Sequence, residues 1–192
     1  MVLRLLSSLC FLALVTVSAV SADTFDIGFN DDSFQLAYET ELSEDTAYGA
    51  TFLKGRFLYN DDKDTKLGSV GLDFVGHPGN IAGLGVGVGV KLYGGKTEPS
   101  VDFINLGVGL NVDYVIPQLE GLGVSGRIDY APKVFSFRDA ERLVETEVRL
   151  TYAVIPKVRL FLGYQNIRLD VEDRSGDMTI DDSVRIGFVG SF

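Results

Sequence analysis

Large apolar residues alternate with small or polar residues along most of the chain. In the segment 84–92, Leu or Val occupies every even position and Gly or Lys every odd position. The same spacing recurs in 104–114, 144–154 and 184–192. A period of two is typical of a β-strand with two different faces, whereas an amphipathic helix repeats about every 3.6 residues. The pattern therefore predicts an all-β protein.

Clusters of Gly, Pro, Asn, Asp and Ser interrupt the alternation and separate the expected strands. The predicted strands are 24–29, 33–42, 46–59, 67–76, 81–93, 101–116, 121–136, 142–154, 158–171 and 183–192. Most have at least the nine to eleven or so residues that a tilted membrane strand needs. The first strand is short, so the sequence predicts about ten strands and leaves eight open. Near Gln165-Asn166 the apolar positions change from even to odd numbers, which predicts a β-bulge.

The first residues resemble an export signal. Arg4 precedes a mostly apolar run over 5–17, and the small-residue segment 20–22 follows. This order is typical of a cleaved secretory signal peptide. The run is also shorter than the roughly 20 residues of a transmembrane helix. We expect a signal peptide over 1–22 and one exported domain over 23–192, which would lack the only Cys and therefore any disulfide.

Alternation alone does not decide which face of the sheet points outward. A soluble barrel or sandwich buries its apolar face, whereas a membrane barrel turns that face toward lipid. The polar face is unusually rich in glycine, with Gly83, Gly85, Gly87, Gly89, Gly107, Gly109 and Gly123. Glycine weakens a solvated strand, but inside a narrow barrel it leaves room for side chains from the opposite wall. We therefore predict a transmembrane up-and-down antiparallel β-barrel, and keep a soluble periplasmic ligand-binding barrel as an alternative.

Charged residues of both signs lie on the polar face, which is expected to line the lumen. Because buried charges must be paired, we expect a lumen largely filled by a network of Lys54, Arg56, Asp73, Lys91, Asp113, Arg127, Asp129, Glu145, Glu147, Arg149, Arg159 and Arg185. Asp26, Glu39, Glu41 and Lys133 are assigned to the same face. The whole chain has 17 Lys and Arg against 27 Asp and Glu, a net charge of −10. The excess acid falls in predicted loops such as 61–64 and 173–182, and this balance disfavours nucleic-acid binding.

The sequence offers weak signals for catalysis or metal binding. His77, the only histidine, falls in a predicted turn, so a Ser–His nucleophile is not expected. Glu145 and Glu147 share a face and could act as an acid/base pair, but the neighbouring Arg149 favours a salt-bridge ladder. The acidic segment 170–182 lacks the ordered spacing of a calcium loop. Weak divalent-cation binding there stays open beside a solvated loop, and we expect no catalytic, cofactor or metal site.

The end of the chain resembles a known signal. Val184, Ile186, Phe188 and the terminal Phe192 alternate to the last residue, as in the C-terminal assembly signal of bacterial outer-membrane barrels. Such a signal implies the barrel-assembly machinery as a partner.

The whole mature chain also resembles the YfaZ family of small outer-membrane proteins of Gram-negative bacteria. The features that carry this resemblance are the start 23–26, the Gly/Val strand 83–90 and the end 187–192. The resemblance implies a location in the outer membrane, but it brings no catalytic residues.

These features predict a monomer in contact with outer-membrane lipid and lipopolysaccharide, with a structural or surface-interaction role. Barrels of about eight strands are just filled by side chains, whereas open channels need about sixteen. A narrow, porin-like channel for ions or small solutes is the first alternative, and a barrel enzyme acting on lipid is a weaker one.

Overall fold

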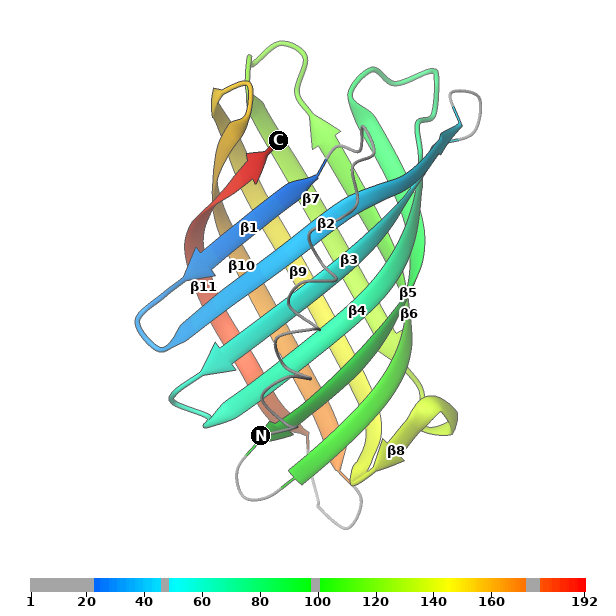
Figure 1. Ribbon diagram of the computed structural model, residues 1–192, viewed down its shortest axis with the longest axis vertical. Coiled ribbons are helices and arrows are strands. Elements are labelled where there is room, and N and C mark those ends of the chain that lie inside the picture. Colours follow the sequence, from blue (N-terminus) through cyan, green and yellow to red (C-terminus); the bar gives the residue numbers. More distant parts are fainter. Residues whose placement is uncertain (1–22, 46–48, 98–100, 172–176) are drawn as a thin grey trace, which may run out of the picture.

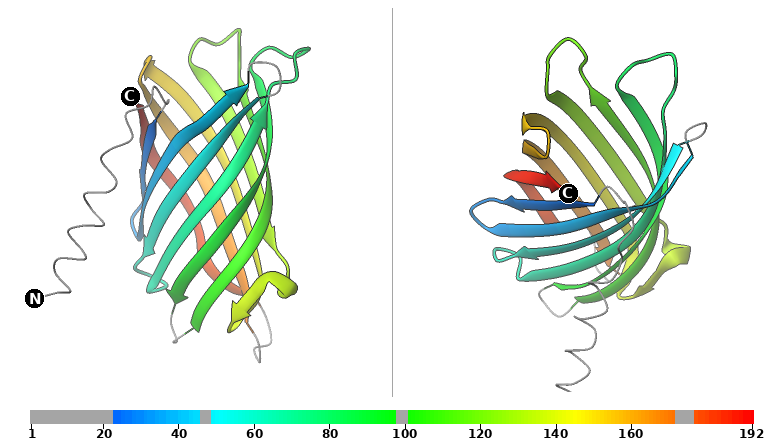
Figure 2. Two further views of the ribbon diagram at one scale, coloured as in Figure 1. Left: turned by 45° about the vertical axis from the view of Figure 1, so that its right-hand side comes forward. Right: turned by 45° about the horizontal axis from the view of Figure 1, so that its top comes forward.

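In the computed structural model, antiparallel strands form a closed barrel (Figures 1 and 2). The structure describes residues 23–45, 49–97, 101–171 and 177–192, so the expected signal peptide lies outside the described residues. The long strands are β1 Thr24–Phe29, β2 Ser33–Asp45, β3 Gly49–Asn60, β4 Thr65–Gly76, β5 Leu84–Thr97, β6 Val101–Val115, β7 Leu122–Ala131, β9 Ala140–Ile155, β10 Val158–Val171 and β11 Met178–Ser191. Between β7 and β9 lie a single 3₁₀ turn, η1 Lys133–Phe135, and the short strand β8 Ser136–Arg138.

Each long strand pairs with its neighbours in the chain, and the first pairs with the last. The order is β5-β4-β3-β2-β1-β11-β10-β9-β7-β6, and the pairing of β5 with β6 closes the circle. Thr24 of β1 lies opposite Ser191 of β11. The prediction of an up-and-down antiparallel barrel with ten long strands is therefore confirmed. Within the described residues, no helix is long and apolar enough to cross a membrane.

The two ends of the barrel differ in what they carry. We call the end where β1 begins and β11 finishes the terminus end; it is the upper end in Figure 1. The turns 77–83, 116–121 and 156–157 lie there as well. The opposite end, which we call the loop end, carries the turn 61–64 and the excursion formed by η1 and β8 (Figure 1).

The predicted strand 121–136 is too long: β7 ends at Ala131, and the excursion formed by η1 and β8 follows it. Pro132, which has no backbone N–H to donate to the ladder, follows β7 directly, and η1 begins after it. Lys133 therefore lies outside the barrel, where its side chain pairs with Glu141, instead of in the lumen. Gly83 is also displaced from its predicted strand face. It has a φ of +81°, and it forms part of the turn before β5.

The predicted bulge exists, but it lies on the partner strand. The register between β10 and β11 shifts between Ile167 and Arg168, so that Ile180 is an extra residue on β11. Along β10, Gln165, Ile167 and Leu169 are all buried on the same inward face, so the alternation of β10 does not slip. The predicted position on β10 was therefore wrong, because the apolar residues Ile167 and Leu169 point into the lumen and not outward.

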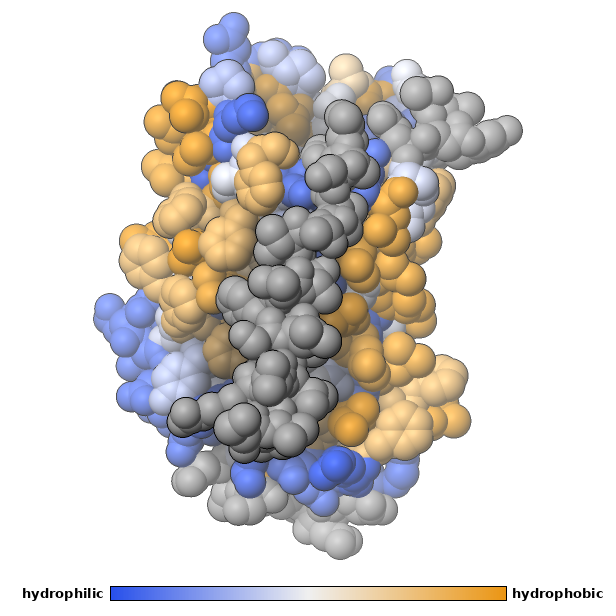
Figure 3. Space-filling model, viewed as in Figure 1, coloured by the Kyte–Doolittle hydropathy of each residue, from blue (hydrophilic) through white to orange (hydrophobic). Residues whose placement is uncertain are grey.

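Apolar side chains cover the outside of the barrel wall (Figure 3). Val108 and Leu110 of β6 are 56% and 58% exposed, whereas Asn105 on the opposite face is fully buried. Hydrophilic side chains gather at the loop end in the view of Figure 3. An exposed apolar area of this extent is typical of a surface that contacts lipid or another apolar partner.

Candidate functional site

Inward-facing glycines make room for the side chains that fill the lumen. A Cβ added to Gly89 would overlap Oδ1 of Asp73, and one added to Gly109 would overlap Oδ1 of Asp129. By contrast, a Cβ on the outward Gly55 would meet no atom within 4 Å. The glycine-rich face of the sheet is therefore the face against which the buried carboxylates pack.

Glu145 of β9 lies at the centre of the buried charge network. Its side chain is fully buried and accepts a hydrogen bond on each oxygen from the guanidinium of Arg56. Lys91 Nζ donates to Oε2 at 2.9 Å, and the hydroxyl of Tyr93 donates to the same oxygen at 2.7 Å. Gln165 Nε2 donates to Oε1 at 2.6 Å. These donors come from three different strands, β3, β5 and β10, so this carboxylate joins opposite walls of the barrel.

Arg127 of β7 holds a second pair of carboxylates. It donates to both oxygens of Asp73 across the lumen, at 2.6 and 3.1 Å, and to both oxygens of Asp129 on its own strand, at 2.6 and 2.8 Å. Lys54 lies 3.2 Å from Asp73, and Lys91 lies 3.4 Å from Asp129. Because Lys91 also contacts Glu145, the two groups form one continuous network.

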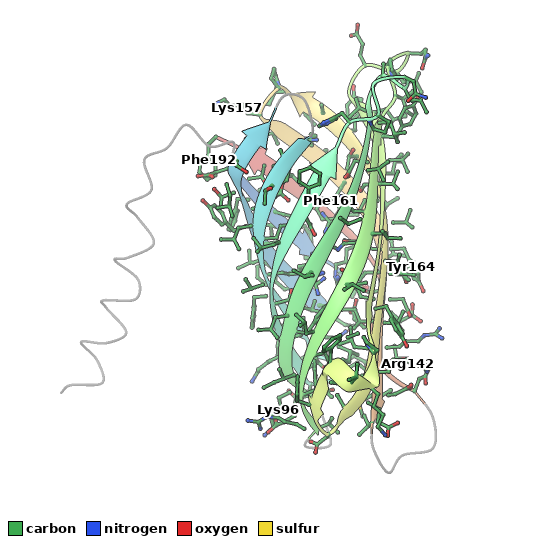
Figure 4. The ribbon with its side chains drawn as sticks, turned by 90° about the vertical axis from the view of Figure 1, so that its right-hand side faces the viewer. Lys96, Arg142, Lys157, Phe161, Tyr164 and Phe192 are labelled. Carbon is green, nitrogen blue, oxygen red and sulfur yellow. The ribbon has the colours of Figure 1, made fainter. Side chains whose placement is uncertain are left out.

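A third group lies nearer the terminus end, around Arg149 of β9. Its guanidinium pairs with Asp26 of β1 and donates to Glu147 at 2.5 Å. It also stacks on the ring of Phe161, 4.3 Å from the ring centroid. That ring in turn occupies the space that a Cβ on Gly187 would need. Figure 4 shows Phe161 near the end of the barrel marked by Lys157 and Phe192.

A fourth group surrounds Arg185 of β11. It pairs with the fully buried Asp181 at 2.7 Å and donates to Ser33 Oγ at 3.0 Å. Asp181 also accepts from Asn60 Nδ2 at 2.9 Å. The sequence analysis placed Asp181 in a solvated loop because it stands in a run of acidic residues. Strand β11 begins at Met178, earlier than the predicted start at 183, and Asp181 shares its inward face with Arg185 and Gly187.

The structure places all the residues of the expected charge network on the lumen side of the wall. All of them except Asp113 and Arg159 make ion pairs among the described residues. Sequence reasoning missed Tyr93, Gln165 and Asp181. Tyr93 and Gln165 share their strand faces with Lys91 and Arg159, so the alternation could have indicated them, whereas Asp181 lies in a segment that was predicted to be a loop. The residues of the expected assembly signal lie on the last strand: Val184, Ile186 and Phe188 are exposed on its outer face, and Phe192 is 66% exposed.

An apolar plug closes the lumen at the loop end. It consists of Leu58, Leu67, Tyr93, Val101, Phe103, Ala131, Ala140, Leu143, Ile167, Leu169, Val171 and Ile180. These residues come from β3, β4, β5, β6, β7, β9, β10 and β11, and they lie toward the loop ends of those strands. The plug was not predicted from the sequence, which led to the expectation of a lumen largely filled by paired charges.

A cavity remains in the other half of the lumen. It has a volume of about 260 Å³ and is lined by inward residues near the terminus end, among them Thr24, Asp26, Lys54, Arg149 and Arg159. Its lining includes members of the charge network, so the network forms its floor. From the loop end to the terminus end, the lumen therefore contains an apolar plug, a layer of ion pairs and a polar cavity.

The geometry offers little to a metal ion. In the described part of the chain, no group of three or more His, Cys, Asp or Glu side chains is placed to hold one. Glu145 is enclosed by donors and Glu147 by Arg149, an arrangement that corresponds to a salt-bridge ladder. His77 is exposed in a turn at the terminus end.

Comparison with known protein families identifies the family of this chain. The family described as "YfaZ precursor" matches residues 2–192. The chain belongs to the YfaZ family. The resemblance noted from the sequence is thus confirmed over nearly the whole chain. A search of curated proteins finds no match.

Comparison with solved structures finds similar chains. A chain from "Unveiling the Mechanism Behind the in-meso Crystallization of Membrane Proteins" aligns with a TM-score of 0.51 at 10% identity, over 90% of the YfaZ chain and 83% of its own length. The KdgM porin aligns with a TM-score of 0.46 at 13% identity, and the alignment covers 90% of this chain and 99% of the porin chain. The outer membrane protease OmpT from Escherichia coli aligns with a TM-score of 0.46 at 10% identity, and the alignment covers 90% of this chain and 93% of the protease chain. At these identities the likeness concerns the fold alone.

Proposed function

We propose that this YfaZ protein spans the bacterial outer membrane as a monomeric barrel that does not conduct, with a structural or surface-interaction role. The apolar outer wall supports insertion in lipid, because a water-soluble barrel would bury that face. The C-terminal strand, which presents Val184, Ile186 and Phe188 outward, is the segment that we expect the barrel-assembly machinery to bind. Outer-membrane lipid and lipopolysaccharide would then be the partners of the barrel wall.

The observation that carries the closed-lumen proposal is the plug. Phe103 and Leu143 are 1% and 0% exposed, so water does not reach them from either end. Beneath them, Glu145 and Asp129 are fully buried in ion pairs. An ion that crossed the lumen would have to displace both layers. The enclosed carboxylates are likewise held by Arg and Lys, which supports a role without catalysis.

Conductance of the purified protein in planar bilayers tests this proposal directly. We expect no steady single-channel current, while a known porin inserted in the same bilayers conducts. A reproducible, ion-selective current from the folded barrel would overturn the closed-lumen proposal and favour the narrow channel.

Membrane fractionation of cells tests the location independently. We expect the protein in the outer-membrane fraction, with a gel mobility that changes on heating. A freely soluble mature protein would overturn the membrane proposal and favour a periplasmic barrel.

A further inference from the structure

The cavity at the terminus end holds charges of both signs, and most of them neutralise each other. Lys54 lies 2.6 Å from Glu39 and 3.2 Å from Asp73, and Arg149 pairs with Asp26 and Glu147. A ligand that bound any of these groups would compete with an existing ion pair, although Oδ1 of Asp26 accepts no hydrogen bond from the described residues. The charged groups that are most available to a ligand are therefore those without an ion pair.

Among the described residues that line the cavity, two charged side chains make no ion pair: Arg159 of β10 and Asp113 of β6. Both face the lumen and both are exposed, so water reaches them from the terminus end. Asp113 accepts one long hydrogen bond, 3.4 Å, from Asn111 Nδ2. Around the wall, β9 and β7 lie between their strands. The cavity thus presents one free cation and one free anion within the part of the chain that the structure describes.

This arrangement selects against ligands with a single charge. An anion drawn to Arg159 meets the carboxylates of Glu39, Asp113 and Glu147, and a cation drawn to Asp113 meets Lys54 and Arg149. A molecule that carries both charges satisfies both free groups and leaves the net charge of the cavity unchanged. Charge-assisted hydrogen bonds of this kind are about twice as strong as neutral ones.

The volume limits the size of the ligand. Water occupies roughly 30 Å³ per molecule in the liquid, so a cavity of about 260 Å³ replaces only a small cluster of waters. It lies below the roughly 300–1,000 Å³ of pockets for drug-sized molecules. Thr24, Ser125 and Thr151 add neutral hydroxyl groups to the lining.

We propose that this cavity binds a small zwitterionic solute of amino-acid size, with its carboxylate on Arg159 and its ammonium on Asp113. The plug closes the far side, so the solute enters and leaves by the terminus end. The site is a binding chamber and not a step in a passage. It goes beyond the proposed structural role, because a barrel that does not conduct can still bind a solute.

Ligand titration of the folded protein in detergent, followed by NMR or calorimetry, tests the proposal. The probes are glutamine, acetate and methylamine, which carry both charges, the negative charge alone and the positive charge alone. We expect saturable binding of glutamine, and binding of the other two that is weaker by about tenfold or more. Equal binding of acetate, or no saturable binding of glutamine at millimolar concentrations, would overturn the proposal.

Variants assign the two charges. Arg159→Gln and Asp113→Asn should each weaken glutamine binding by about tenfold or more, whereas Arg159→Lys should retain part of it. The matched control is Arg138→Gln, which removes a cation from β8 that pairs with Asp102 outside the cavity. Heat-dependent gel mobility checks that each variant is folded. Unchanged affinity in the folded Arg159→Gln and Asp113→Asn variants would refute the assignment. Neither outcome bears on the closed-lumen proposal, which bilayer conductance tests separately.

Discussion

Replacement of Glu145 by Gln is the most direct test of the buried network. The change preserves the size of the side chain but removes its charge. In the folded protein this carboxylate accepts from Arg56, Lys91, Tyr93 and Gln165. The amide introduced by Glu145→Gln would have only one acceptor oxygen. Its NH₂ group would point at some of these same donors and could not accept hydrogen bonds from them. Lys91 would keep a 3.4 Å contact with Asp129, but Arg56 has no other ion pair among the described residues.

The expected cost follows from the burial of the pair. The side chains of Arg56 and Glu145 are 8% and 1% exposed. Removal of one partner from a buried ion pair destabilises a protein by about 3–5 kcal/mol, because the other charge is left uncompensated. A loss of about 3 kcal/mol changes the folding equilibrium by roughly 150-fold. The matched control is Glu141→Gln, whose partner Lys133 is 68% exposed, and for which we expect a loss of about 1 kcal/mol or less.

The assay is reversible unfolding by urea in lipid vesicles. Tyrosine fluorescence can follow the transition because the chain has no Trp, and gel mobility gives an independent measure of the folded fraction. We expect Glu145→Gln to unfold at a urea concentration well below that of the wild type. Glu141→Gln should unfold at a urea concentration close to that of the wild type. Equal free energies of unfolding for the two variants would show that the network does not stabilise the barrel in the way argued here.

Three further predictions concern the glycine-rich face, the wall and the last strand. Gly89→Ala should cost about 1–3 kcal/mol in the same assay because its Cβ overlaps a buried carboxylate, whereas Gly55→Ala has open space; equal losses would contradict the packing argument. Val108→Cys should react with a lipid-soluble maleimide and Asn105→Cys should not, and the reverse pattern would mean that the faces of β6 are wrongly assigned. Phe192→Ser should lower the fraction of heat-modifiable protein in the outer membrane, and unchanged assembly would remove the terminal residue from the proposed signal.

The sequence predicted the wall of the barrel better than its interior. Strands such as 104–114 alternate strictly, and the side-chain period of two fixes which residues share a face. The interior depends on contacts between strands far apart in the chain. Arg56 meets Glu145 across 89 positions, and no local pattern indicates that pairing. The apolar plug was missed for a different reason. Ile167 and Leu169 share the inward face of β10 with Arg159, but their apolar side chains resemble those of lipid-facing residues, which favoured the opposite assignment.

The ion pairs across the lumen also determine how the sheet can close. Arg127 of β7 meets Asp73 of β4, and Arg149 of β9 meets Asp26 of β1, so each pair connects strands that are not neighbours. If one strand slid by a single residue, its lumen charges would turn to the outer face of the wall. In the proposed membrane location, an Arg or Lys on that face at the membrane midplane costs about 2–4 kcal/mol. The same slip would leave the partners across the lumen unpaired. We therefore expect the network to disfavour misregistered barrels during assembly as well as to stabilise the finished one.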